Sequence, residues 1–205
     1  MIEGLKSPFA NLLRPMVRPL VAAGIRPNHV TLAGLGLFIV AATMVFLGRW
    51  TLACVMVVFG AILDGIDGLL SREAAQQTAF GAILDSGVDR LTEIVLLLGT
   101  LGYYLSGSPV PAGPAAQQRV AGIAFCYTAV TMSLMVSYLR ARCEGAGIAC
   151  RSGLLQRPER IILLCIGLLL GPRGMVWMLA GLTLLATVTV VQRFIAAYRG
   201  ATGIR

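Results

Sequence analysis

Long, mostly apolar segments are the feature that most constrains how this chain folds. Such segments occupy 30–47, 51–70, 82–105, 120–139, 159–171 and 175–195. A helix needs about 20 apolar residues to cross a hydrocarbon core about 30 Å thick, so each segment is on the scale of a membrane span, although the fifth is short and the third contains acids. An apolar content of 57% and a mean hydropathy of +0.82 exceed those of soluble domains. The sequence therefore predicts an all-α integral membrane protein with six transmembrane helices.

The segment before the first apolar run predicts an N-terminal juxtamembrane amphipathic helix. It mixes arginines with prolines, whereas a signal peptide has one uninterrupted apolar run before its cleavage site. The predicted organisation is a cytoplasmic amphipathic segment at 1–28, a six-helix domain at 29–199 and a cytoplasmic tail at 200–205.

The net charge of +8 is explained by membrane topology and not by nucleic-acid binding. The loops after the first, third and fifth spans hold one arginine each, Arg49, Arg119 and Arg173. Eleven further basic residues cluster before span one and after spans two, four and six, at Lys6, Arg14, Arg18, Arg26, Arg72, Arg140, Arg142, Arg151, Arg157, Arg199 and Arg205. The positive-inside rule then places both termini in the cytoplasm, with the protein in the plasma membrane. The acids also fall on the cytoplasmic side.

Four aspartates lie close together in the segment DGIDGLLSREAAQQTAFGAILDSGVDR, residues 64–90. In a helix, Asp64 and Asp67 share a face at i,i+3 spacing, and Asp85 and Asp89 share one at i,i+4 spacing. The polar residues between the two pairs predict a turn at the cytoplasmic surface. We therefore expect two antiparallel helices whose carboxylate pairs face each other.

Clustered carboxylates at this depth repel one another unless cations neutralise them. The chain has a single histidine, and hard oxygen ligands favour Mg²⁺ or Mn²⁺, with Ca²⁺ as a further possibility. Two such ions can activate a phosphoryl centre, and Arg72 can add a hydrogen bond to phosphate. Intramembrane acids also line cation pathways, so a cation transporter or channel is the alternative from another functional class.

The complete pattern, D-x2-D-G-x3-R-x8-G-x3-D-x3-D, resembles the signature of the CDP-alcohol phosphotransferases, which join a CDP-linked lipid to an alcohol and release CMP. Ser71 departs from it, because the family usually has Ala before the Arg. The resemblance implies six transmembrane helices, a cytoplasm-facing polar cavity and a homodimer. It also implies that Asp64, Asp67, Asp85 and Asp89 bind two metal ions and that Asp89 is the catalytic base. The residues expected to contact the nucleotide of CDP-diacylglycerol are Asn28, Thr31, Gly68, Ser71, Arg72, Thr78 and Gly81.

The segment RPNHVT begins the first span, as a similar segment often does in that family. The resemblance makes Pro27, Asn28 and Thr31 candidate nucleotide contacts. The same residue types also favour the start of a helix, so capping is an equal alternative.

Basic residues at the cytoplasmic ends of the last three spans favour an acceptor that carries a phosphate. Membrane anchoring is the alternative reading of any single arginine. The segments SYLRAR and RPER resemble elements of bacterial phosphatidylinositol-phosphate synthases, and archaeal synthases that use ether lipids share much of the pattern. Arg140 stands where the bacterial enzymes have Lys. We expect transfer from CDP-diacylglycerol to inositol 1-phosphate, or alternatively to glycerol 3-phosphate, with the acceptor phosphate held by Ser137, Arg140, Arg142, Arg157, Arg160 and Arg193.

Overall fold

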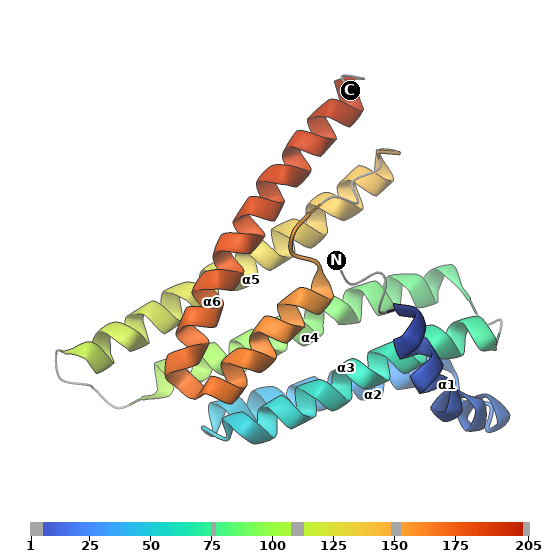
Figure 1. The fold of residues 1–205 in the computed structure, drawn as a ribbon, viewed down its shortest axis with the longest axis horizontal. Helices are drawn as coiled ribbons and strands as arrows, with labels where there is room; N and C mark the ends of the chain where they lie inside the picture. The colour runs from blue at the N-terminus through green and yellow to red at the C-terminus, as the bar shows by residue number, and fades with distance from the viewer. Residues whose placement is uncertain (1–5, 75–76, 108–112, 149–152, 203–205) are drawn as a thin grey trace.

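The computed structural model describes residues 6–74, 77–107, 113–148 and 153–202, and within them the chain forms six α-helices and no strand (Figure 1). The helices are α1 (Lys6–Ala22), α2 (Pro27–Phe46), α3 (Trp50–Glu73), α4 (Ala79–Ser106), α5 (Pro114–Gly145) and α6 (Arg157–Thr202). The all-α prediction is confirmed. Parts of the predicted features, at 1–5, 75–76, 108–112, 149–152 and 203–205, lie outside the described residues, and Arg151 is among them.

Four helices of the described chain, α2, α3, α5 and α6, are long and apolar enough to cross a membrane. Helix α4 has 28 residues, but every 18-residue stretch of it contains Asp89, Arg90 and Glu93. These three charged residues keep α4 below the apolar content that α2, α3, α5 and α6 reach.

The fifth and sixth predicted spans lie in the two halves of α6, which breaks at Gly171. Gly171 has φ 71° and ψ −166°, a conformation that side chains with a Cβ rarely adopt. Pro172 follows it and has no N–H to donate. The Tyr104 hydroxyl donates to the Pro172 carbonyl over 2.6 Å, which ties this break to α4.

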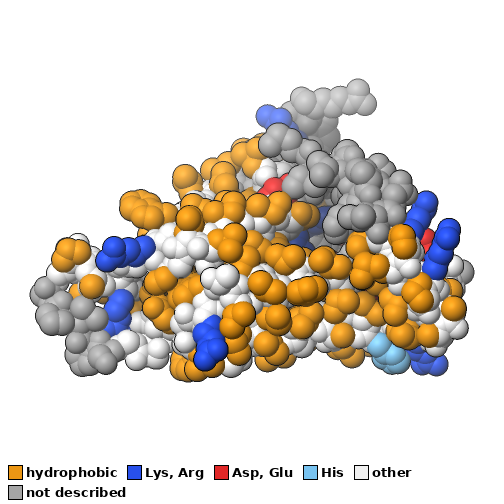
Figure 2. Space-filling model, turned by 60° about the horizontal axis from the view of Figure 1, so that its bottom comes forward, with side chains coloured by type: hydrophobic (Ala, Val, Ile, Leu, Met, Phe, Trp, Pro, Cys, Tyr) orange, Lys and Arg blue, Asp and Glu red, His pale blue; other side chains and the backbone are white. Residues whose placement is uncertain are grey.

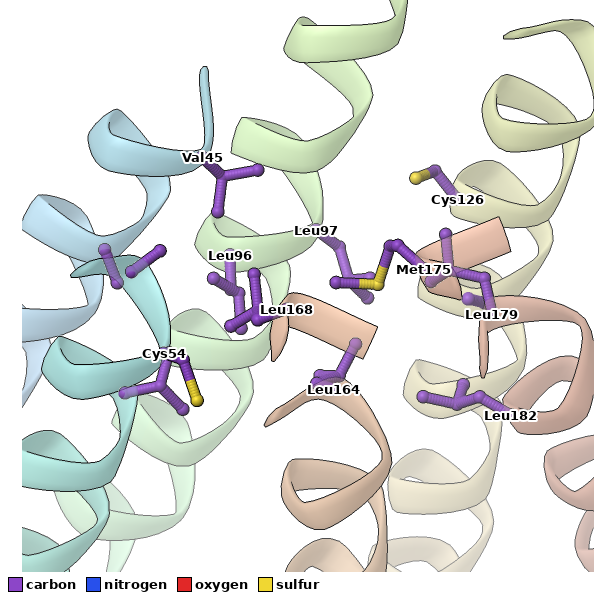
Figure 3. Close-up of a cluster of buried hydrophobic side chains, with 14 of the residues drawn as sticks. Val45, Cys54, Leu96, Leu97, Cys126, Leu164, Leu168, Met175, Leu179 and Leu182 are labelled. Atoms are coloured by element: carbon purple, nitrogen blue, oxygen red, sulfur yellow. The ribbon is translucent and has the colours of Figure 1, made fainter. Parts of the chain in front are cut away.

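The core lies where α2, α3 and α4 meet α5 and α6 (Figure 3). Helix α2 packs against α3 and α4, α5 packs against α4 and α6, and α6 also reaches α3. Leu96 and Leu97 of α4 are buried beside Leu164, Leu168 and further side chains of α6. Helix α4 is therefore held from both sides.

Large apolar side chains also cover the outside of the molecule (Figure 2). Phe59, Tyr127 and Trp177 are all more than half exposed. A soluble monomer rarely exposes so continuous an apolar surface, whereas lipid chains solvate one. The surface and the long apolar helices together identify a multi-pass membrane protein.

Helix α1 packs against the end of α3 that carries Asp67. Its buried residues Leu13 and Val17 join a small apolar cluster with Ile66 and Leu70 of α3. Burial of such side chains stabilises the contact by about 1.5–3 kcal/mol each, so α1 fixes the acidic end of α3.

Candidate active site

Three of the four aspartates converge between α3 and α4. One carboxylate oxygen from each of Asp64, Asp67 and Asp85 lies within 4.8 Å of the other two. Asp67 is 4% exposed, Asp64 is half-buried and Asp85 is exposed at the mouth of the cluster. The expected meeting of the carboxylate pairs is therefore present, with one deeply buried member and one open to solvent.

This cluster fits a divalent cation. Two oxygens that both lie about 2.0–2.6 Å from one ion are separated by at most about 5 Å, and the observed 4.8 Å limit falls in that range. The donors are carboxylates, which Mg²⁺, Mn²⁺ and Ca²⁺ all accept. Asp64, Asp67 and Asp85 can thus hold a metal ion, with Asp89 next to them on α4.

Asp89 joins the cluster through an arginine from the start of α6. Arg157 Nη1 lies 2.6 Å from Asp64 Oδ2 and 2.8 Å from Asp89 Oδ1. The contact with Asp64 is a hydrogen bond, while Asp89 Oδ1 and Arg157 Nε make no well-directed hydrogen bond to any described residue. Arg157 was predicted to bind the acceptor phosphate, and in this structure its guanidinium contacts the carboxylates of Asp64 and Asp89.

Thr31 contacts the deepest aspartate. Its hydroxyl donates to Asp67 Oδ2 over 2.6 Å and also lies 3.2 Å from the Pro27 carbonyl. Pro27 is the first residue of α2, and the N-cap residue Arg26 makes no side-chain capping bond. Thr31 is thus not an N-cap. Its hydroxyl orients Asp67, a candidate metal ligand, and this contact was not predicted from the sequence.

The predicted nucleotide-binding residues surround the turn between α3 and α4. Thr78 is the N-cap of α4, and its hydroxyl accepts from Gly81 N over 2.9 Å. A Cβ on Gly81 would lie only 2.9 Å from that hydroxyl, so glycine leaves room for the cap, and it would lie 3.6 Å from Asn28 Oδ1, an ordinary contact with α2. On α3, Arg72 Nε donates to the Gly68 carbonyl over 2.9 Å. Ser71, the remaining candidate on α3, is half-buried and directly precedes Arg72.

A second ion pair joins α4 to α6 one helical turn further along. Arg160 Nε lies 3.0 Å from Glu93 Oε2, and the two side chains are only 5% and 4% exposed. Glu93 was not predicted as a site residue. Its i,i+4 spacing from Asp89 was the available signal, because that spacing puts both acids on one face of α4.

Behind this pair lies a small cavity of about 10 Å³ between α4 and α5. Glu93, Arg90, Ser133 and Ser137 supply its polar lining. Glu93 Oε1 and Ser133 Oγ are buried and have no hydrogen-bond partner within the described chain. This volume is close to the lower limit for one water molecule. Ser137, predicted to bind the acceptor, therefore lies beside the buried ion pair.

The remaining predicted arginines divide between exposed and buried positions. Arg140 Nε is 2.8 Å from Glu144 Oε1 on the exposed end of α5, and Arg142 is exposed nearby on the same helix. Arg193 of α6 is buried and donates through Nη1 to the Val136 carbonyl of α5. The arginines that were predicted as one set thus have different surroundings.

The fold and the site together define a multi-pass α-helical membrane protein whose acidic, metal-competent centre lies at one end of its helices. A sequence model described as CDP-alcohol phosphatidyltransferase matches residues 25–192, which include every aspartate of the centre. The chain belongs to this family, and the resemblance seen in its signature is confirmed.

Curated relatives named phosphatidylinositol phosphate synthase are similar over most of their length. The Mycolicibacterium smegmatis protein is 31% identical over 163 residues, covering 79% of this chain and 69% of the relative. The Corynebacterium glutamicum protein is 32% identical, covering 94% and 86%. The crystal structure of the Mycobacterium tuberculosis synthase with CDP-DAG bound has a TM-score of 0.80 and 25% identity, covering 93% of this chain and 96% of that one. Another structure of that synthase contains manganese and citrate.

Proposed function

We propose that this chain transfers the phosphatidyl group of CDP-diacylglycerol to inositol 1-phosphate, giving phosphatidylinositol phosphate and CMP. The observation that carries the proposal is the Asp64, Asp67 and Asp85 cluster, set in the signature of a phosphatidyl-transferring family. The names of the relatives support the choice of acceptor. Family membership also argues against the cation-transporter alternative.

The reaction makes one phosphorus–oxygen bond and breaks another. The acceptor hydroxyl oxygen attacks the phosphorus that carries diacylglycerol, CMP leaves, and the hydroxyl proton passes to Asp89. Asp89 suits this role because its buried Oδ1 makes no well-directed hydrogen bond within the described structure, and its contact in that structure is the ion pair with Arg157 Nη1 at 2.8 Å. A base must lie within reach of the proton that it removes, and Asp89 lies next to the metal-competent cluster.

The residues present fit a divalent metal site, in which Asp64, Asp67, Asp85 and Asp89 would hold two Mg²⁺ or Mn²⁺ ions. Bound there, the ions would neutralise the pyrophosphate oxygens and stabilise the CMP leaving group. Thr31 keeps Asp67 oriented through its hydrogen bond. Asn28, Gly68, Ser71, Arg72, Thr78 and Gly81 would contact the nucleotide.

A phosphorylated acceptor accounts for the basic residues near this end of the fold. Guanidinium groups bind phosphate with two parallel hydrogen bonds. Arg160 and Arg193 are buried, where Arg160 contacts Glu93 and Arg193 donates to the Val136 carbonyl, so an acceptor phosphate would use the remaining N–H donors of these guanidinium groups. We assign the acceptor phosphate to these two residues together with Ser137, Arg140, Arg142 and Arg157.

The proposal also includes a topology. The chain would cross the plasma membrane six times, with α4 and both halves of α6 counted as spans and α1 lying at the cytoplasmic surface. The aspartates and both termini would face the cytoplasm. This corresponds to the segments 1–28, 29–199 and 200–205 and, by the family resemblance, to a homodimer.

An acceptor screen tests the function. The purified protein, supplied with CDP-diacylglycerol and Mg²⁺ or Mn²⁺, should release CMP with inositol 1-phosphate and much less with glycerol 3-phosphate. Asp67→Asn provides the inactive control. Efficient CMP release with free inositol, and none with either phosphate, would overturn the acceptor assignment. Turnover with glycerol 3-phosphate alone would identify a phosphatidylglycerophosphate synthase instead.

A further inference from the structure

Arg157 contacts two of the carboxylates that the proposed metal site uses. Its Nη1 atom contacts Asp64 Oδ2 at 2.6 Å and Asp89 Oδ1 at 2.8 Å, so a single nitrogen joins one carboxylate from α3 to one from α4. The arginine comes from a helix that is distant in sequence from both. It supplies the positive charge in direct contact with this pair of acids.

A metal ion at this site and the guanidinium of Arg157 would both lie against the carboxylates of Asp64 and Asp89. Each carboxylate keeps further lone pairs for a metal ion, but two cations held at such short range repel each other, so metal binding opposes the contact with Arg157. The present position of Arg157 is also incompletely satisfied, because its buried Nε finds no hydrogen-bond partner among the described residues. The guanidinium is therefore not fully hydrogen-bonded in this position.

We propose that Arg157 is a cation that holds Asp64 and Asp89 together before metal binding and is displaced from them when a divalent cation binds. This inference rests on the metal site of the proposed function. It gives Arg157 two successive positions: on the aspartates first, and afterwards free to contact an anionic substrate group. Arg157 is thus a positioning residue for Asp64 and Asp89 as well as a candidate phosphate ligand.

The neighbouring ion pair explains how Arg157 can move without loosening α6. Arg160 and Glu93 are almost fully buried, whereas the side chains of Arg157 and Asp89 are each 21% exposed. Breaking a buried pair is strongly unfavourable, while a partly solvated pair exchanges its partners more easily. The buried pair therefore keeps the start of α6 on α4 during the exchange.

Metal titration without any substrate tests this inference. Purified full-length protein is titrated with Mn²⁺ by calorimetry as wild type, Arg157→Gln and Arg90→Gln. Arg90→Gln is the matched control. It removes the same charge from the residue next to Asp89 in sequence, but the Arg90 guanidinium donates to the Ser86 carbonyl of its own helix. We expect Arg157→Gln to bind Mn²⁺ about tenfold more tightly than wild type, and Arg90→Gln to change affinity by less than about threefold.

Metal-induced thermal stabilisation provides a second readout if Arg157→Gln is weakly folded without metal. The increase in Tm on adding Mn²⁺ should then be larger in Arg157→Gln, and in Arg157→Met, than in wild type. Equal or weaker Mn²⁺ affinity in Arg157→Gln, or an increase in Tm no larger than that of wild type, would overturn the inference. A wild-type protein that binds no Mn²⁺ would overturn the metal site itself, and an altered acceptor preference would leave this result unaffected.

Discussion

Removing the buried acid of the second ion pair should strongly destabilise the fold. In Glu93→Ala, the guanidinium of Arg160 loses the carboxylate 3.0 Å away at a site where its side chain is about 5% exposed. The site is nearly dry, so the guanidinium keeps its charge without an ionic partner, and breaking such a pair lowers the free energy of unfolding by about 3–5 kcal/mol. This loss is a large part of the typical stability of a domain, about 5–15 kcal/mol.

Unfolding in mixed detergent micelles, followed by tryptophan fluorescence or circular dichroism, measures this loss. Glu144→Ala is the matched control, because it also removes a glutamate from an arginine pair within a helical segment. The Arg140–Glu144 side chains are 51% and 56% exposed, so the control should lose no more than about 0.5 kcal/mol.

The double variant Glu93→Ala/Arg160→Met separates the two contributions. If the penalty comes from an uncompensated buried charge, replacing the charge by an apolar side chain should recover much of the stability. A loss of less than about 1 kcal/mol in Glu93→Ala, or no recovery in the double variant, would refute the reasoning from burial.

Three further variants test the roles of individual residues. Asp89→Asn should lower kcat by at least about a hundredfold while CDP-diacylglycerol binding with metal is retained, because an amide cannot accept the proton; near-normal turnover with Mg²⁺ would contradict its role as base. Thr31→Val should weaken Mn²⁺ binding by about tenfold, since Asp67 loses its 2.6 Å hydrogen bond; unchanged affinity by calorimetry would contradict that positioning role. Arg193→Ala should raise the KM for inositol 1-phosphate about ten- to a hundredfold and leave that for CDP-diacylglycerol nearly unchanged, and equal changes in both would argue against a phosphate contact.

Short-range spacing was sufficient to predict the acidic half of the site. Asp64 and Asp67 share a face of α3 because they are three residues apart, and the polar turn after them brings Asp85 back beside them. The helices were also predictable, because apolar length determines them. The break at Gly171 and Pro172 lies where the fifth predicted span ends, before the sixth begins. The chain is helical on both sides of this break.

The partners of the arginines could not be predicted in the same way. Arg157 meets Asp64 across 93 positions of sequence, and Arg160 meets Glu93 across 67. No local periodicity encodes such pairings, because they depend on how α6 packs against α3 and α4. Thr31 shows the same limit, since its contact with Asp67 spans 36 positions.

Burial is what separates residues that look equivalent in the sequence. Arg157 and Arg160 lie three positions apart, at the start of one helix, and both face acids of α4 that are four positions apart. The pair nearer the metal-competent cluster is partly solvated and can exchange its cation, whereas the next pair is nearly dry and holds the helices together. The contact between α4 and α6 thereby combines an ion pair that can be replaced by a metal ion, at Arg157, with an ion pair that stays in place, at Arg160. This division predicts that substitutions at Arg157 alter metal binding, while substitutions at Glu93 alter stability.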